Sequence, residues 1–197
     1  MATTQVDRNM AERILDVAEG LVQVRGFNAF SYADVAHELG VTKASIHYHF
    51  PTKSDLGEAL IGRYAGRFAE SLERIDAEGS DAYAMLHAYA GLYGDVLAGE
   101  RMCLCGMLAA EYPTLPVPVQ RHVLRFFDEQ EAWLAGVLER GRAEGTLRFD
   151  GRPNEVARTI VSSLEGAILV ARPFGDVARF DVVVSRVLDG LSPDTPS

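Results

Sequence analysis

Lysine, cysteine and long apolar runs are scarce in this chain of 197 residues. Only two of its 19 basic residues are lysines, Lys43 and Lys53. Its two cysteines, Cys103 and Cys105, are too few for a disulfide framework or a complete metal site. No apolar run approaches the roughly 20 residues that cross a bilayer, and the first residues lack the apolar segment of a secretory signal. We therefore expect a soluble, cytoplasmic protein without a metal, a cofactor or a membrane partner.

Catalytic motifs are also missing, which argues against an enzyme. The sequence holds no His-Glu-x-x-His, Glu-x-x-His or Gly-x-Ser-x-Gly pattern and no glycine-rich phosphate loop. Asp34 and His37 stand one helical turn apart, but the pair lies on an exposed helix, where solvation is more common than metal binding. An all-α enzyme is therefore kept only as a competing hypothesis to a binding protein.

The formal net charge of −9 is distributed unevenly along the chain. Between Leu39 and Ser54 there are two lysines, two histidines and no carboxylate, so an acidic protein carries one locally basic segment. Phosphate contacts can also come from helix N-termini and hydroxyl groups, which carry no formal charge. The charge balance is therefore compatible with nucleic-acid binding, and an apolar content of 48% is sufficient for a folded core.

Apolar residues recur at helical spacing through most of the chain, and no clear period-2 strand is present. The pattern predicts an all-α protein of about nine helices that are separated at glycines and prolines. The predicted helices cover about residues 7–25, 31–39, 42–49, 52–77, 81–98, 103–111, 119–144, 153–171 and 176–191. The proline-rich segment 112–118 is predicted to be a connection.

Residues 31–53 are the most informative segment of the chain. Ser31 and Asp34 have the spacing of a capping box, Gly40 permits an abrupt helix end, and Thr42 caps a second helix of about two turns. Two short helices joined by a glycine turn form a helix-turn-helix, whose second helix lies in the DNA major groove. The outward positions of that helix hold Lys43, Ser45, His47, Tyr48 and His49. This density of donors argues against a helical interaction module without a DNA function.

The segment resembles the TetR family of transcriptional regulators, in which Gly-Val-Ser/Thr-Lys precedes an aromatic-rich end, a lysine and a leucine. Here the sequence runs Gly40-Val-Thr-Lys43, then His47-Tyr-His-Phe50, then Pro51-Thr-Lys53, and Leu56 follows. The resemblance covers about the first sixty residues. It implies a three-helix DNA-binding head and a larger helical body for ligand binding and dimerisation.

The same resemblance implies domains, partners and contact residues. The DNA-binding domain would cover residues 1–52 and the ligand-binding and dimerisation domain residues 53–197. A homodimer formed through the last two helices would bind a palindromic operator in double-stranded DNA. The predicted DNA-binding residues are Ser31, Tyr32, Thr42, Lys43, Ala44, Ser45, His47, Tyr48, His49 and Lys53.

Different roles are expected within this DNA-binding set. Thr42 and Lys53 match family positions that bind phosphates, whereas Lys43, Ser45 and Tyr48 project from the part of the helix that reads bases. His47 departs from the pattern, because the family usually has a tyrosine there that often contacts a phosphate. Imidazole can make the same contact, but its charge would then depend on pH.

The body of the family encloses a small-molecule pocket, and aromatic and polar residues in the middle helices are candidates to line it. They are Tyr89, Tyr93, Cys103, Met107, Phe126, Phe127, Gln130, Trp133, Glu165 and Ile168. Such a site is usually apolar with a few polar groups, although each of these residues alone could equally be plain core. The apolar stripes of residues 153–191 favour a dimer interface, with intramolecular packing as the alternative.

Residues 101–111 resemble a Gly-Cys-Leu…Ala-Glu segment in one branch of the family, which includes the electrophile-sensing repressor of N-ethylmaleimide reductase. Cys103 matches the sensing cysteine of that branch, and a helix N-terminus with Arg101 nearby would favour a thiolate. Alternatively, Cys103 and Cys105 are small residues that pack a helix. The sequence therefore predicts a ligand-responsive repressor for a hydrophobic or aromatic effector, with a redox or electrophile sensor as the alternative.

Overall fold

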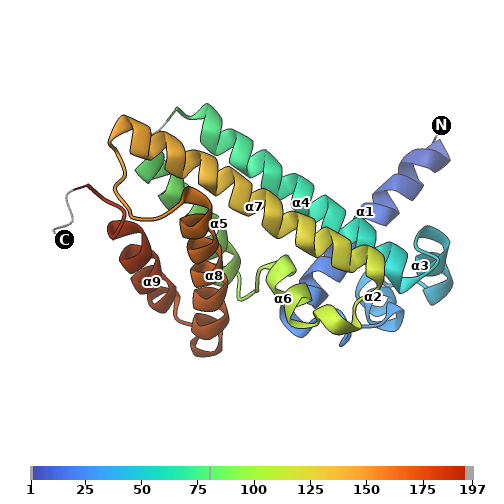
Figure 1. The fold of residues 1–197 in the computed structure, drawn as a ribbon. Coiled ribbons are helices and arrows are strands. Elements are labelled where there is room, and N and C mark those ends of the chain that lie inside the picture. Colours follow the sequence, from blue (N-terminus) through green and yellow to red (C-terminus); the bar gives the residue numbers. More distant parts are fainter. Residues whose placement is uncertain (1, 80, 194–197) are drawn as a thin grey trace. The chain divides into compact units, whose positions relative to one another are not determined.

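The computed structural model describes residues 2–79 and 81–193, and Figure 1 shows the helices that they form. In chain order the helices are α1 (Ala2–Arg25), α2 (Tyr32–Leu39), α3 (Lys43–His49), α4 (Lys53–Ala77), α5 (Ala82–Ala98), α6 (Leu104–Ala110), η1 (Tyr112–Thr114), α7 (Val117–Glu144), α8 (Pro153–Ala171), η2 (Arg172–Phe174) and α9 (Val177–Asp189). The described residues form no strand, so the predicted all-α class is confirmed.

Backbone contacts divide the chain into two compact units. The first unit combines Met1–Gly66 with Leu104–Leu124, and the second combines Arg67–Cys103 with Arg125–Ser197. The continuous helices α4 and α7 each contribute residues to both units. The first unit therefore includes α6, η1 and the start of α7, which follow α5 in the sequence.

Local capping explains why the helix-turn-helix segment folds as it does. The side chain of Ser31 accepts the Ala33 N–H, and Asp34 accepts the Ser31 N–H at 2.7 Å, which completes a capping box. Gly40 ends α2 in the left-handed conformation, with φ 65°, which glycine adopts at little cost. The Thr42 hydroxyl then accepts the Ser45 N–H at 3.3 Å and caps the seven-residue α3.

The core of the first unit consists of side chains from all of its α-helices, whereas η1 contributes none. Helix α1 packs against α2 and α6, and α2 packs against α3. Its buried apolar residues include Ile14, Ala18, Val22, Phe27, Phe30, Val35, Ile46, Phe50, Leu56, Leu60, Leu115 and Val119. Full burial of one such aliphatic or aromatic side chain contributes about 1.5–3 kcal/mol to folding, so this interior is sufficient to hold the seven-residue α3 in place.

Gly57 allows the closest approach of helices in this core. A Cβ atom at this position would lie 2.9 Å from the ring of Phe27 and 2.9 Å from a methyl group of Val119. Both distances are shorter than real Cβ contacts. A side chain at position 57 would therefore force α4 away from the α1–α2 turn and from the start of α7.

The second unit is built around α5, α8 and α9, which pack against one another. Its buried apolar side chains include Leu86, Leu97, Leu134, Leu138, Ile160, Leu164, Phe180, Val184 and Leu188. The Tyr83 hydroxyl donates to the Asp189 carboxylate at 2.8 Å and so connects the start of α5 to the end of α9.

Candidate functional site

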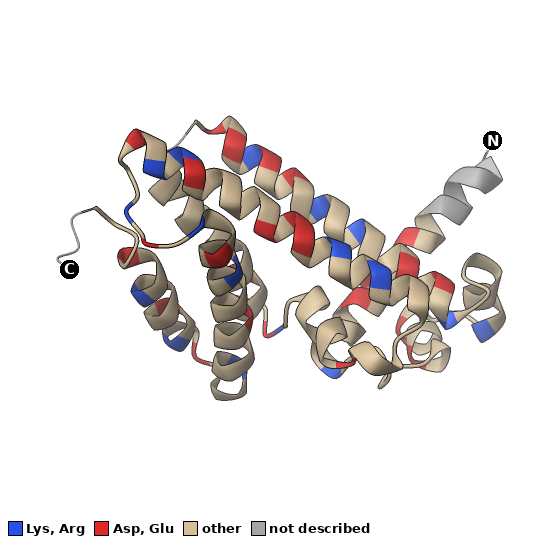
Figure 2. Ribbon diagram, in the orientation of Figure 1, with Lys and Arg blue, Asp and Glu red and all other residues tan. Residues whose placement is uncertain are grey.

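The outer face of α3 is exposed and carries no acidic residue. Lys43, Ala44, His47 and Tyr48 are exposed, and the Tyr48 side chain reaches 73% relative exposure. Figure 2 shows a basic residue and no acidic residue on the ribbon of this helix. Ile46 faces inward and is fully buried, which fixes the rotation of the helix about its axis. Two of the three side chains that the sequence assigned to base reading, Lys43 and Tyr48, are thus exposed on the same helix.

Ser45, His49 and the two capping residues complete this surface. Ser45 and His49 are half-buried, and the His49 ring lies edge-on to Tyr48 with 5.1 Å between their centroids. Thr42 and Ser31 are exposed, but their hydroxyl groups already serve the two helix caps. Each hydroxyl has further hydrogen-bonding capacity, so a cap and a phosphate contact are compatible.

The exposed ring of His47 contacts the buried Tyr32 beneath this surface. The Tyr32 hydroxyl donates to the Phe50 carbonyl at 2.8 Å, and its ring lies 4.6 Å from the imidazole of His47. Burial raises the pKa of Tyr32 to about 12, and Asp55 adds to the effect. Because the Pro51 carbonyl can only accept, His47 Nδ1 must be the donor in their 3.1 Å contact. The second ring nitrogen, Nε2, is then an acceptor unless the ring gains a proton.

Lys53 occupies a more enclosed position than the other basic residue of the segment. Its Nζ donates to the carbonyl of Phe30 and lies 4.3 Å from the Phe30 ring centroid and 4.8 Å from that of Phe27. Burial lowers the pKa of this amine. An ammonium group has three donors, so Lys53 retains two for a phosphate beside its bond to the Phe30 carbonyl. This phosphate contact stays a prediction.

Two polar connections that the sequence did not indicate hold the first unit together. Glu111, directly after α6, accepts the Phe27 N–H at 2.6 Å and the Asn28 N–H at 3.2 Å. Arg63 on α4 donates to three acids of α1, with distances of 3.0 Å to Glu12, 2.8 Å to Asp16 and 3.1 Å to Glu19. No periodic pattern could reveal these partners, because they are 44 to 84 residues apart.

The second unit brings four of the ten candidate ligand-binding residues together with Phe68 in one aromatic cluster, which consists of Phe68, Tyr89, Tyr93, Phe126 and Trp133. Phe68 lies edge-on to three of the rings, with centroid distances of 6.1 Å, 6.1 Å and 5.2 Å to Tyr89, Tyr93 and Phe126. Tyr89 stacks on Trp133 at 5.7 Å, and the Trp133 indole N–H donates to Asp76 at 2.9 Å. Phe68 was not among the predicted residues, since it belongs to α4.

The buried carboxyl group of Glu165 lies near this aromatic cluster, and the buried Gln130 shares α7 with Phe126 and Trp133. Glu165 acts electrostatically on both Tyr89 and Tyr93, and the Cys103 thiol faces its carboxyl group as a weak donor. Burial raises the pKa of Glu165 to about 7. Gln130 is 3% exposed and follows Phe126 by one helical turn.

The remaining candidates lie around the cluster or in the other unit. Phe127 is half-buried with its ring 5.5 Å from that of Phe126, and Ile168 is fully buried one turn after Glu165. Met107 is half-buried on α6 and belongs to the first unit. Cys103 and Cys105 are both buried free thiols.

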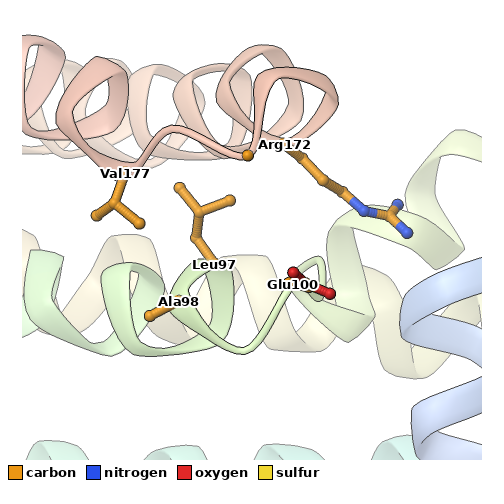
Figure 3. Close-up of a pocket in the computed structure, with 6 residues that line it drawn as sticks. Leu97, Ala98, Glu100, Arg172 and Val177 are labelled. Carbon is orange, nitrogen blue, oxygen red and sulfur yellow. The ribbon is translucent and has the colours of Figure 1, made fainter.

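A separate surface cavity of about 290 Å³ lies where α5 and η2 end. Leu97 and Val177 form apolar walls, and the charged side chains of Glu100 and Arg172 flank it (Figure 3). Glu100 has a φ of 58°, and its N–H bonds to the Leu97 carbonyl at the end of α5. No motif in the sequence indicates this cavity.

Neither a membrane-spanning helix nor a metal-binding cluster occurs within the described part of the chain. No helix there is both long and apolar enough to cross a membrane. Over the same residues, no group of three or more histidine, cysteine or acidic side chains could hold a metal ion.

Comparisons with known proteins agree with this architecture. Residues 14–60 match the model of bacterial regulatory proteins of the TetR family, and residues 84–187 match the tetracyclin repressor-like C-terminal domain. A TetR-family transcriptional regulator from Agrobacterium tumefaciens has a solved structure that is similar, with 35% identity and a TM-score of 0.91, over 94% of this chain and 99% of that one.

Curated relatives are similar over most of their length. The repressor DhaR of Mycobacterium sp. strain GP1 is 26% identical over 200 residues, which cover 99% of this chain and 96% of that protein. The repressor NemR of Escherichia coli K12 is 24% identical over 170 residues, which cover 84% of this chain and 85% of that protein. With two family models spanning head and body, the chain belongs to the TetR family of bacterial regulatory proteins.

Proposed function

We propose that this regulator is a repressor that binds a palindromic operator as a homodimer and leaves it when a small apolar or aromatic effector binds. The observation that carries the proposal is the exposed face of α3, where Lys43, His47 and Tyr48 project without an acidic neighbour on the helix. Helices presented in this way enter the major groove and read base edges. The curated relatives DhaR and NemR are described as transcriptional repressors, which supports the same role.

The DNA-reading part of the proposal lies within residues 1–52, and residues 53–197 would supply effector binding and dimerisation. Lys43, Ser45 and Tyr48 would contact bases, while Thr42, His47 and Lys53 would contact phosphates. The caps at Ser31 and Thr42 support this division, because they place the N-terminal ends of α2 and α3 at exposed positions, and helix N-termini favour phosphates.

A homodimer through α8 and α9 is supported by apolar side chains that the chain leaves uncovered. The relative exposures of Leu169, Val170, Phe174 and Val182 are 57%, 62%, 60% and 62%. Large apolar patches at a surface usually mark an interface. Packing within one subunit, which was the alternative, would bury these four side chains.

The effector would bind at the aromatic cluster of the second unit. Aromatic walls with a few polar groups are the usual form of a small-molecule site. No observation favours thiol sensing as a second function, because Cys103 is buried and faces a carboxyl group. A reactive cysteine normally requires access and a neighbouring cation.

A gel-shift experiment with the DNA upstream of the protein's own gene tests the DNA-binding part. We expect retardation by the wild-type protein and weaker retardation by Lys43→Ala. Light scattering after size exclusion tests the dimer: Val182→Asp should lower the mass from two chains to one. Val117→Asp is the matched control, because Val117 on α7 has the same 62% exposure. Retained dimers with Val182→Asp, or equal effects of both substitutions, would contradict the interface.

A further inference from the structure

Among the described residues, three buried acceptor atoms of the second unit receive no N–H or O–H donor. They are both carboxyl oxygens of Glu165 and the amide oxygen Oε1 of Gln130. Most buried polar side-chain atoms in proteins are hydrogen-bonded, and a carboxylate is especially costly to bury alone. All three atoms require a donor, so a complementary group would donate hydrogen bonds and accept none.

The neighbouring side chains do not supply such a donor. The Tyr89 and Tyr93 hydroxyl groups bond to each other at 3.2 Å, and neither bonds to Glu165 or to Oε1 of Gln130. The Cys103 thiol faces Glu165 but is only a weak donor. Glu131 on α7, whose charge also reaches Tyr89, is paired with Arg158 of α8 at 2.9 Å. Among the described residues, two causes shift the pKa of the Glu165 carboxyl: burial and a hydrogen bond from the Cys103 thiol. No positively charged side chain contributes to this shift.

The aromatic cluster around these acceptors favours a positive charge. The faces of tyrosine, tryptophan and phenylalanine rings attract cations within about 6 Å of their centroids. Phe68 and Trp133 join the two tyrosines in a continuous set of ring contacts. Gln130 belongs to the same side of α7, because it lies between Phe126 and Trp133 at helical spacing.

We propose that the effector is an organic cation whose ammonium or amidinium group is bound by Glu165 and Gln130 and whose apolar body lies among the rings of the aromatic cluster. The inference rests on the proposed effector site and specifies its ligand class. An anionic effector would be repelled by Glu165, and a neutral apolar effector would leave all three acceptors without donors.

This recognition makes binding depend on pH in a defined direction. Burial raises the pKa of the Glu165 carboxyl to about 7, so in the free protein the group is largely protonated below that pH. A cation must displace this proton, and its affinity therefore falls about tenfold for each pH unit below the pKa. Burial raises the pKa values of Tyr89 and Tyr93, which interact with the same carboxyl, so both hydroxyl groups remain neutral over this range.

Three probes of matched shape test the proposal by titration calorimetry: 4-phenylbutylamine, 4-phenylbutanol and 4-phenylbutyrate. At pH 8 we expect wild-type protein to bind the amine at least about tenfold more tightly than the alcohol, and the carboxylate most weakly. The amine should lose roughly 30-fold in affinity between pH 8 and pH 5.5. The alcohol should bind equally at both pH values.

Single substitutions test whether Glu165 and Gln130 cause the preference for the amine. Glu165→Gln should remove both the preference for the amine and its pH dependence, while it leaves alcohol binding within about twofold. Gln130→Met should weaken amine binding by a smaller factor and leave the pH dependence in place. Glu139→Gln, which neutralises an exposed acid of α7, is the matched control and should change nothing. Circular dichroism verifies that each variant is folded.

The outcomes separate this inference from the proposed function. Equal affinity for amine and alcohol in the wild type, no binding of the amine, or an amine preference that survives Glu165→Gln would overturn the cation assignment. The gel shift with upstream DNA is measured independently of the probes. Failure of that gel shift would contradict the proposed function, whereas a positive gel shift with no amine preference would contradict only the ligand class.

Discussion

The carboxylate of Glu111 accepts the backbone N–H of Phe27 at 2.6 Å, although 84 residues separate the two in the sequence. Phe27 directly follows Gly26, which has a φ of 96° and ends α1. Its N–H is partly buried and points away from the helix, so the carboxylate provides a partner that the turn itself lacks. The segment after α6 is thereby attached to the entry of the helix-turn-helix.

Glu111→Ala should destabilise the first unit. A hydrogen bond to a charged acceptor contributes about 1.5–3 kcal/mol, and the substitution leaves the N–H groups of Phe27 and Asn28 without this acceptor. Urea unfolding should show a loss of about that size. Glu38→Ala, at an exposed acid of α2, is the control and should change stability by less than about 0.5 kcal/mol. Equal losses in the two variants would contradict the role of Glu111.

Lys53→Met separates the core role of Lys53 from its role in DNA binding. The methionine keeps an apolar stem over the rings of Phe27 and Phe30 but removes the donor to the Phe30 carbonyl. We expect a lower free energy of unfolding by about 1 kcal/mol. If the remaining ammonium protons contact a phosphate, DNA binding should weaken equally for specific and random DNA. The salt slope, which is the slope of the logarithm of the binding constant against the logarithm of the salt concentration, should fall in magnitude by about one. An unchanged salt slope would show that Lys53 contacts no phosphate and serves only the core of the first unit.

Lys43→Ala should relax the sequence preference of the regulator. Lys43 opens α3 and is exposed, and lysine is suited to the acceptor edge of guanine. Selection of bound sequences from a random pool should show lost preference at one or two symmetric positions, at about 1–3 kcal/mol each. Arg121→Ala removes one exposed charge on α7 as a control and should preserve the selected motif. An identical motif with Lys43→Ala would refute the assignment.

Glu165→Gln should stabilise the protein above neutral pH. The pKa of Glu165 is raised by burial from 4.5 to about 7. Above pH 7 the folded state therefore carries a charged group that the unfolded state solvates better, at a cost of about 3 kcal/mol. This cost declines as pH falls from 7 to 4.5 and is lost below 4.5, where the carboxyl is protonated in both states. Thermal unfolding should show a large gain at pH 8 and little gain at pH 4.5, and an equal gain at both would contradict the burial of the charge.

Local signals explain why so much of the head could be predicted from the sequence. The spacing of Ser31 and Asp34, the glycine at position 40 and the hydroxyl of Thr42 act over a few residues, and the structure confirms both caps and the turn. The start of α7 differs, because Pro118 is accommodated in the first helical turn, where its missing N–H has no partner to lose. Helix α7 therefore begins at Val117, two residues before the predicted position.

The contacts that could not be predicted from the sequence join residues that lie far apart in it. Nothing near Glu111 indicates that it bonds to the turn after α1, and nothing near Lys53 indicates that its amine lies over two rings of the core. Glu165 could be named as a polar residue among apolar neighbours. Its lack of a donor depends on residues from α5 and α7, which only the folded chain brings to it.

The division of the first unit into Met1–Gly66 and Leu104–Leu124 limits how the reading head can be exchanged between relatives. A chimaera that transplants only Met1–Gly66 separates the Phe27 N–H from its acceptor Glu111. It also separates Gly57 from Val119, which packs against it. The operator specificity of such a chimaera would then be measured on a DNA-binding head whose two segments come from different proteins. Portability of this head therefore requires that both segments are transferred together, as a two-part graft.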